Sequence, residues 1–362
     1  MGGSISARFG RAAAVVKRFV DEGKIPGAVL LIGYEGEEYG PVAYGWAVLE
    51  PETEKRPVRE DTLFDMASCS KVIGTTTAAL ILLDRGEVRL DDPVSLFIPE
   101  WQGEGKDRVR LRHLLTHTSG LPAWKDLYSQ GQGPEEVVSQ ICAMPLEYET
   151  GKRVVYSCLG FILLGEITRR VTGLRLDQFL SEEVFGPLGM TDTMYCPPES
   201  LRERIAATER KPGTDEVLIG VVHDENARAM GGVSGNAGLF STARDVGRFC
   251  RMYLQGGTLE GVRVLSPAVI EAATRSYTPG LEEERGLGWL IRGDGVFSSA
   301  GDLMSPRAYG HTGFTGTSLW IDPERDLYVV LLTNRVHPSR ENNHHLRLRP
   351  LVANAAVAAV DW

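Results

Sequence analysis

The sequence predicts a two-domain α+β protein, in which an antiparallel sheet flanked by terminal helices carries an inserted all-helical domain. The chain has 362 residues, which is long for one hydrophobic core and favours two packed units. Short apolar runs rich in β-branched residues occur near both ends, whereas helical periodicity fills the middle. We therefore expect residues 1–67 and 275–362 to form the mixed domain and residues 68–274 the helical domain, with the functional site in the cleft between them.

The first elements are a helix and a hairpin. Apolar residues share one helical face over residues 6–22, and Gly23 ends that helix. Two apolar, β-branched runs follow at 27–34 and 42–49. The polar turn at 35–38 joins them, which predicts an antiparallel hairpin.

The middle of the chain reads as helices broken by loops. A helical pattern begins at Ser68 and continues to about Asp84. Either Ser241 or Thr242 can cap a later helix. Further helices are expected at 137–143, 160–171, 177–184 and 245–254.

Strand patterns return near Leu287, and a helix closes the chain. The turn at 322–325 connects the last two strands, and the closing helix is Ala-rich and runs from about 349 to 360. Four short strands are expected at 287–291, 308–313, 317–321 and 326–333.

The composition restricts the class of partner. The formal net charge is −9, which argues against nucleic acid or an anionic membrane surface and leaves a small-molecule substrate open. The first residues carry no apolar signal core, and no stretch of about 18 apolar residues occurs, so we expect a cytoplasmic protein without a membrane span. The five cysteines have irregular spacing and are expected to be free thiols.

A serine and a lysine one helical turn apart form the first candidate for chemistry. The run FDMASCSK at 64–71 holds an S-x-x-K pattern, which places Lys71 over the same helix face as Ser68. A serine hydroxyl is a weak nucleophile until a base accepts its proton. Because an ordinary lysine is protonated, we expect Lys71 to be buried and partly uncharged at neutral pH. Taken alone, the pattern is more typical of an ordinary helix start with a solvated lysine.

Two further patterns gain weight beside the first. Tyr156 precedes a helix and offers a phenol that can pass a proton to a leaving group. His311, Thr312 and Gly313 lie in a strand, where the histidine can donate to a substrate and the glycine lets it approach the backbone. The N–H of Phe314 can then join that of Ser68 as an oxyanion hole. Singly, a core tyrosine and a satisfied buried histidine explain the same residues.

The order and separation of these patterns resemble one family. The chain is similar to class C β-lactamases, serine DD-peptidases, D-aminopeptidases and family VIII carboxylesterases, which use S-x-x-K, then Y-x-N, then K-T-G or H-T-G. The resemblance covers nearly the whole chain. Longer matches to the family are LLTHTSGLP at 114–122, GFILLG at 160–165, PLGM at 187–190 and AGLFST at 237–242.

The resemblance implies a β-lactamase-like fold and a serine hydrolase. It assigns Ser68 as the acylated nucleophile, Lys71 as the general base, Tyr156 as the proton shuttle and His311 as the residue of the third motif. The sequence departs from the family at Cys158, where the family usually has an asparagine that binds the substrate's amide. Because a thiol is a poor hydrogen-bond partner, ester turnover is favoured over β-lactam and peptide turnover.

We therefore expect a carboxylesterase that acts through an acyl-enzyme on Ser68. The alternatives are a D-aminopeptidase, DD-peptidase or weak β-lactamase, and a non-catalytic penicillin-binding or sensor protein. The substrate is a small ester, amide or β-lactam, bound with the help of Cys158, Thr312 and Gly313; no metal or organic cofactor is implied, and the oligomeric state stays open. His113 and His117 have a spacing that suits a metal but fall in the family's loop motif. A histidine cluster near the C-terminus, at 337, 344 and 345, is expected to be a solvated loop.

Overall fold

A seven-stranded antiparallel sheet is built from both ends of the chain, in the order β3-β2-β1-β12-β11-β10-β9. The computed structural model describes residues 5–129, 133–211, 213–214, 216–293 and 298–360. The strands of the sheet are β1 (Gly27–Tyr34), β2 (Glu37–Val48), β3 (Arg56–Pro57), β9 (Leu290–Ile291), β10 (Tyr309–Thr312), β11 (Ser318–Asp322) and β12 (Leu327–Thr333).

Both faces of the central strands are buried. In β1, Leu30 packs against the terminal helices, whereas Leu31 faces the opposite core. In β12, Leu331 and Leu332 divide between the two cores in the same way, and Leu331 pairs with Leu30 across the strands. A strand covered on both faces reads as a continuous apolar run, which is the pattern seen in the sequence.

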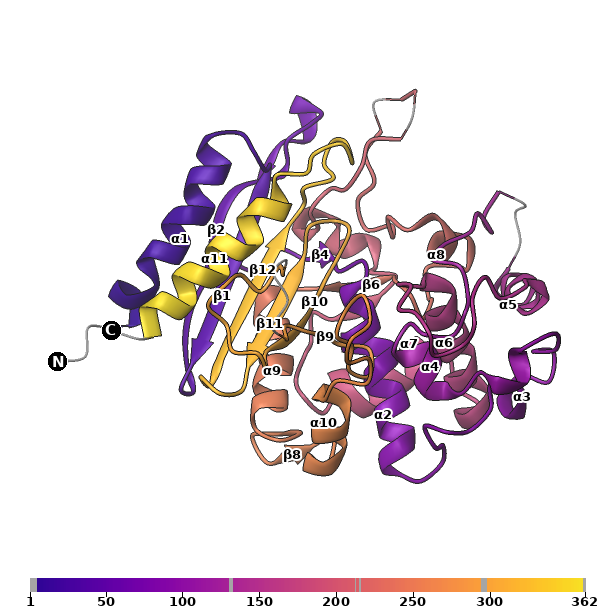
Figure 1. Cartoon of the computed structure of the whole chain (residues 1–362). Helices are drawn as coiled ribbons and strands as arrows, with labels where there is room; N and C mark the ends of the chain where they lie inside the picture. The colour runs from indigo at the N-terminus through magenta and orange to yellow at the C-terminus, as the bar shows by residue number, and fades with distance from the viewer. Residues whose placement is uncertain (1–4, 130–132, 212, 215, 294–297, 361–362) are drawn as a thin grey trace.

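The two terminal helices cover one face of this sheet. Helix α1 (Ile5–Asp21) packs against α11 (His345–Val360), although they lie at opposite ends of the sequence (Figure 1). Gly23 follows α1 with a φ of 67°, a left-handed conformation that ends a helix. The prediction of an antiparallel sheet flanked by terminal helices is confirmed, and α11 begins four residues earlier than expected.

The middle of the chain lies on the other side of the sheet (Figure 1). Helix α9 packs on β1 and β12, and its N-cap is Thr242, whose hydroxyl accepts the N–H of Asp245. The helices of this part are α2 (Thr77–Asp84), α3 (Val94–Phe97), α4 (Leu111–Leu115), α5 (Pro134–Ala143), α6 (Cys158–Thr172), α7 (Leu176–Leu180), α8 (Glu225–Ala229), α9 (Ala243–Leu254) and α10 (Pro267–Thr274).

Short strands also occur in the middle of the chain. One small sheet has the order β4-β6-β5, and a hairpin joins the strands β7 and β8. Each has only two or three residues, too few to show an alternating pattern in the sequence. Their bounds are β4 (Phe64–Asp65), β5 (Met194–Tyr195), β6 (Leu239–Ser241), β7 (Thr258–Leu259) and β8 (Val262–Arg263). The domain boundaries after residues 67 and 274 stay a prediction.

The helix that follows Ser68 is wider than the sequence predicts. Residues Lys71–Thr76 form a π-helical segment, and the α-helix begins only at Thr77. The hydroxyl of Thr77 donates to the carbonyl of Val72, five residues earlier, at 2.9 Å. Segments of this kind are rare and concentrate at functional sites.

The expectation of a solvated histidine loop near the C-terminus is wrong for two of its three members. His337 is buried, and its Nε2 accepts the N–H of Leu49 at 2.9 Å, so the ring holds the end of β2. His345 is buried at the start of α11. Among the described residues, no helix has the length and apolar character needed to cross a membrane.

Candidate active site

Ser68 and Lys71 meet as the spacing predicts. Ser68 lies in the turn that precedes the π-helical segment, and Lys71 is the first residue of that segment. The distance from Lys71 Nζ to Ser68 Oγ is 3.1 Å, and Lys71 is fully buried. The amine and the hydroxyl are therefore within direct proton-transfer distance.

Three other groups surround the amine of Lys71. Its Nζ donates to the carbonyl of Asn236 at 2.9 Å and contacts Cys158 Sγ at 3.5 Å, while the ring of Tyr156 lies 5.0 Å away. Burial lowers the pKa of Lys71, but Cys158 and Tyr156 raise it by more, so this pKa lies above its ordinary value. This direction argues against the expectation of a partly uncharged Lys71 in the resting site.

Tyr156 completes the group around Ser68. Its buried hydroxyl has no hydrogen-bond partner among the described residues. Burial raises the pKa of Tyr156, although Lys71 lowers it, and the phenol keeps its proton at neutral pH. An unpartnered hydroxyl beside a nucleophile and an amine is free to exchange a proton with substrate.

The loop at 114–122 fixes the second motif. His117 Nδ1 accepts the N–H of Ser157 at 2.9 Å, and the hydroxyl of Ser157 donates to the carbonyl of Pro122 at 2.7 Å. The N–H of Cys158 donates to the carbonyl of Ala123 at 2.9 Å. His117 therefore supports the backbone beside Tyr156. The described residues contain no cluster of three or more histidine, cysteine or carboxylate side chains that could hold a metal.

His311 is an acceptor in this site, which corrects its expected role as a donor. It is buried in β10, and its Nδ1 lies 2.8 Å from the carbonyl of Thr312, an atom that only accepts. Burial, Arg285 and Lys71 hold the pKa of His311 well below its usual range, so the ring is neutral. The proton is therefore on Nδ1, and Nε2, which has no partner in the described part of the chain, carries a lone pair.

Gly313 is required by the nucleophile turn. A Cβ at Gly313 would lie 2.6 Å from the carbonyl of Met66 and 2.2 Å from the hydroxyl of Thr317. The third motif therefore packs directly on the residues before Ser68. Close approach of a substrate was the expected reason for this glycine, but the structure gives the approach of two backbone segments instead.

The two backbone groups of the predicted oxyanion hole are both free. Neither the N–H of Ser68 nor that of Phe314 donates a hydrogen bond to any group that the structure describes. Ala67 lies between β4 and Ser68 and has a φ of 45°, a conformation that costs a non-glycine residue roughly 1–2 kcal/mol. Strain of this kind next to a nucleophile is typical of an active-site turn.

A cavity of about 340 Å³ contains most of the predicted site. Cys158 is not among the residues that line it and contacts the amine of Lys71. The predicted residues on the wall are Ser68, Tyr156, His311, Thr312, Gly313 and Phe314.

The sequence did not identify the arginines of this cavity. Arg285 is buried, pairs with Glu283 at 2.9 Å and lies over the ring of Tyr156. Arg349 donates to the carbonyl of Gly313, and burial lowers its pKa to about 10. Arg335 donates to the carbonyl of Phe314 at 2.7 Å. Arginine is common on surfaces, so no local pattern marks these three as buried.

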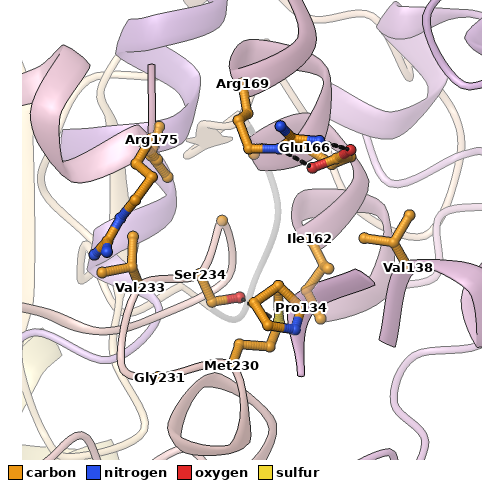
Figure 2. Close-up of a pocket in the computed structure, with 13 residues that line it drawn as sticks. Pro134, Val138, Ile162, Glu166, Arg169, Arg175, Met230, Gly231, Val233 and Ser234 are labelled. Carbon is orange, nitrogen blue, oxygen red and sulfur yellow. Dashed lines mark hydrogen bonds and ion pairs between the residues drawn. The ribbon is translucent and has the colours of Figure 1, made fainter. Parts of the chain in front are cut away.

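A second pocket, of about 200 Å³, is lined in part by Met230, Val233 and Ser234 (Figure 2), just before Asn236, whose carbonyl accepts from Lys71. Ile162 and Met230 contribute apolar side chains, and Arg169 is paired with Glu166 at its edge. None of the predicted site residues is among the described residues that line it. The chemistry therefore belongs to the cavity at Ser68.

Comparisons with known proteins identify the family of this chain. The family model Beta-lactamase matches residues 12–354. A protein of Escherichia coli (strain K12), provisionally named a D-alanyl-D-alanine carboxypeptidase, is 35% identical over 315 residues, 78% of this chain and 72% of the relative. A Bacillus subtilis (strain 168) protein named N-acetylmuramyl-L-alanine amidase is 33% identical over 344 residues, 86% of this chain and 78% of the relative.

Solved structures show the same fold at lower identity. EstCE1, described as a hydrolase with promiscuous acyltransferase activity, has a TM-score of 0.79 at 23% identity and covers 97% of this chain and 99% of its own. A penicillin-binding protein homologue from Caulobacter crescentus has a TM-score of 0.79 at 24% identity, with 99% of each chain covered. A class C beta-lactamase has a TM-score of 0.77 at 21% identity, with 98% of each chain covered.

Proposed function

The chain belongs to the beta-lactamase family of serine hydrolases, and within it we propose a carboxylesterase that forms an acyl-enzyme on Ser68. The observation that carries this proposal is the 3.1 Å contact between Lys71 Nζ and Ser68 Oγ inside a buried site. Burying a charged amine is costly, so a buried amine beside a hydroxyl indicates a functional pair. The free N–H groups of Ser68 and Phe314 supply the second requirement, a place for the oxyanion.

The Lys71–Tyr156 pair acts as the base in this mechanism. Since the pKa of Lys71 is raised and the phenol of Tyr156 is protonated at rest, the active form is the pair that has lost one proton. That form accepts the proton of Ser68 as Oγ attacks the ester carbonyl. The kcat/KM for acylation therefore rises with pH until the pair has lost this proton.

The remaining steps return the proton. The tetrahedral intermediate collapses, the bond from carbon to the alcohol oxygen breaks, and Tyr156 delivers the proton to the leaving alcohol. Water then attacks the acyl group on Ser68, the same pair accepts its proton, and Ser68 leaves with a proton restored. His311 stays neutral and presents Nε2 to the substrate as an acceptor.

Cys158 supports an ester as the preferred substrate. Its thiol contacts Lys71 at 3.5 Å and offers no amide group to a substrate. An ester lacks the N–H that a peptide or amide must have satisfied, so it loses less from this substitution.

A peptidase that releases a residue with a free carboxylate is the second candidate. Arg285 favours it, because its Nη1 is buried beside the cavity and has no partner in the described chain, and guanidinium groups bind carboxylates well. The name of the Escherichia coli relative, a D-alanyl-D-alanine carboxypeptidase, points the same way, and that of the Bacillus subtilis relative, an amidase, also favours an amide bond over an ester.

A substrate panel separates the two candidates. We expect p-nitrophenyl acetate to give a burst of about one equivalent, followed by steady release. Acetyl-D-alanyl-D-alanine and its C-terminal amide form the matched pair for the second candidate. Faster cleavage of acetyl-D-alanyl-D-alanine than of p-nitrophenyl acetate would reverse the order of the two proposals. If the wild type prefers acetyl-D-alanyl-D-alanine over its C-terminal amide and Arg285→Gln loses that preference, Arg285 binds the carboxylate.

A further inference from the structure

Asp65 is a buried carboxylate three residues before Ser68, in β4. Its Oδ1 accepts the N–H of Ala67 at 2.8 Å, and its Oδ2 accepts the N–H of His223 at 2.6 Å. Neither the mechanism above nor the sequence motifs give this residue a role. Two charge-assisted hydrogen bonds to backbone groups from different parts of the chain make it a rigid connection.

One of these bonds fixes the turn that carries the nucleophile. Ala67 has the left-handed φ of 45°, which its side chain disfavours. The bond from its N–H to Asp65 Oδ1 favours this conformation, and the bond from Met66 N–H to the carbonyl of Leu239 holds the residue before it. The direction of the next N–H, that of Ser68, is set by this turn.

The other bonds of Asp65 lead to the second half of the oxyanion hole. The hydroxyl of Thr315, next to Phe314, donates to the backbone carbonyl of Asp65 at 2.7 Å. The ring of His223 stacks on the ring of Phe314, with centroids 5.6 Å apart and planes at 27°. Arg335 covers the same ring at 4.3 Å.

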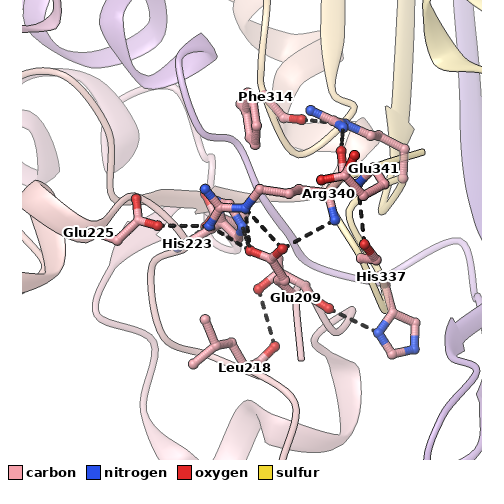
Figure 3. A network of polar contacts seen from close by, with 12 residues as sticks. Glu209, Leu218, His223, Glu225, Phe314, His337, Arg340 and Glu341 are labelled. Atoms are coloured by element: carbon pink, nitrogen blue, oxygen red, sulfur yellow. Dashed lines mark hydrogen bonds and ion pairs between the residues drawn. The ribbon is translucent and has the colours of Figure 1, made fainter. Parts of the chain in front are cut away.

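His223 is itself held by a network of charged groups (Figure 3). Its Nε2 lies 3.0 Å from Glu209, which Arg340 contacts through Nε at 2.7 Å. Arg340 also donates to Glu225 at 2.7 Å. The ring that supports Phe314 is thus fixed from one side by this network and, through its backbone, by Asp65 from the other.

We propose that Asp65 is the positioning residue that sets the two oxyanion-hole N–H groups, those of Ser68 and Phe314, at their working separation. This inference rests on the proposed function, because it assigns a task to the oxyanion hole used there. The two N–H groups come from segments about 246 positions apart in the sequence. The carboxylate of Asp65 accepts the N–H of Ala67, next to Ser68, and the N–H of His223, whose ring stacks on Phe314.

Asp65→Asn tests the inference, since an amide keeps one acceptor and turns a donor toward the other N–H. With p-nitrophenyl acetate we expect kcat to fall about 100-fold while KM changes less than about threefold, because misplaced donors weaken only the transition state. The affinity for phenylboronic acid, which forms a tetrahedral adduct on Ser68 and places an oxygen in the hole, falls by a similar factor.

The matched control is Asp245→Asn. Asp245 is also buried and accepts the N–H of Asp192 at 2.8 Å and the hydroxyl of Thr193 at 2.9 Å, outside the site. We expect it to lower Tm as Asp65→Asn does and to leave kcat and boronate affinity within about twofold. Equal losses of kcat in the two variants would reduce Asp65 to a structural role and overturn the inference.

Two further measurements keep the outcome decisive. If Asp65→Asn does not fold, His223→Ala keeps the N–H that Asp65 accepts and removes the ring that stacks on Phe314. An unchanged kcat in that variant overturns the inference, whereas a three- to tenfold loss with constant KM supports it. Fluorophosphonate labelling of Ser68 in the wild type tests the proposed function separately. A labelled wild type with fully active Asp65→Asn defeats the inference alone, and a wild type without label at Ser68 defeats both.

Discussion

Two buried lysines, Lys71 and Lys106, have similar surroundings and different consequences. Both are almost fully buried, and each lies over an aromatic ring, at 5.0 Å from Tyr156 and 4.8 Å from Trp101. Each also donates to a backbone carbonyl, Lys71 to Asn236 and Lys106 to Cys142. Burial, a ring and a carbonyl are therefore not enough to define a catalytic lysine.

The difference lies in the acidic hydrogens that face the amine. Lys71 contacts the hydroxyl of Ser68 and the thiol of Cys158, and its pKa is raised although burial lowers it. Lys106 has no hydroxyl or phenol partner in the described chain, and burial lowers its pKa by more than the Cys142 thiol raises it. A desolvated amine alone thus loses its proton more easily, whereas the amine beside Ser68 keeps it and shares it with its neighbours.

Removal of the nucleophile gives the largest expected effect. Ser68→Ala should lower kcat about 10⁴-fold or more, because the acyl-enzyme has no oxygen on which to form. Steady-state hydrolysis of p-nitrophenyl acetate and mass spectrometry after fluorophosphonate treatment measure it. Ser70→Ala is the control, since its hydroxyl accepts the N–H of Leu239 at 3.1 Å. Label on another serine would contradict the assignment.

The two lysines themselves give the next effect. Lys71→Met should lower kcat about 10³-fold, and Lys71→Arg should be nearly as inactive because guanidinium keeps its proton. Lys106→Met should leave kcat within about twofold and change the free energy of unfolding by less than about 1.5 kcal/mol. Kinetics and urea unfolding of all three variants are the measurements. Equal losses of activity at both positions would mean that burial, and not the hydroxyl partner, defines the lysine.

The sequence predicts contacts that are close along the chain. The pairing of Ser68 with Lys71 needs only one helical turn, and the β1–β2 hairpin needs only its own alternation and turn. The resemblance to a known family then brought Tyr156 and His311 into the same site. These parts of the fold and site were predicted because each is a local pattern or belongs to a known motif.

Long-range contacts are what the sequence did not predict. The bond between Asp65 and His223 joins residues 158 positions apart, and Asp65 appears in the sequence only as one residue of the first motif. One local detail was also not predicted: the proton position on His311 depends on the carbonyl of the next residue, Thr312, which no residue type reveals. The raised pKa of Lys71 also follows from Cys158, which the sequence places 87 positions away.

The charge at Lys71 also affects the histidines around it, which gives a pH-dependent effect. Burial, Arg285 and Lys71 hold the pKa of His117 well below its usual range. No histidine is among the groups that shift the pKa of Lys106, so this effect belongs to the Lys71 site. Below about pH 6.5 the unfolded chain binds a proton that the folded ring does not, so stability falls as pH falls. Each such histidine contributes about 1.4 kcal/mol per pH unit in this range.

His117→Asn isolates one of these contributions. Asparagine tolerates the φ of 59° at this position and keeps an acceptor for the N–H of Ser157. Between pH 6.5 and 5.5 the wild type should lose about 1 kcal/mol more stability than the variant, and between pH 7.5 and 6.5 less than about 0.5 kcal/mol more, as urea unfolding at the three pH values measures. Identical losses would mean that His117 titrates alike in the folded and unfolded chains.

The smallest expected effect concerns Cys158, the thiol beside Lys71. It has no counterpart among the oxygen and nitrogen groups usual at this position of the family, where an asparagine is typical. Cys158→Asn places a carbonyl oxygen where the thiol meets Lys71 at 3.5 Å and leaves an amide N–H for the substrate. That contact contributes about 0.5–1.5 kcal/mol, or roughly a three- to tenfold gain in kcat/KM for D-amino-acid amides and β-lactams. For p-nitrophenyl esters, we expect little change.

Cys196→Asn is the control, because Cys196 is exposed and has a φ of 47° that asparagine accepts. Efficient cephalosporin hydrolysis by the wild type, or an equal loss for both substrate classes in Cys158→Asn, would mean that the thiol does not determine specificity.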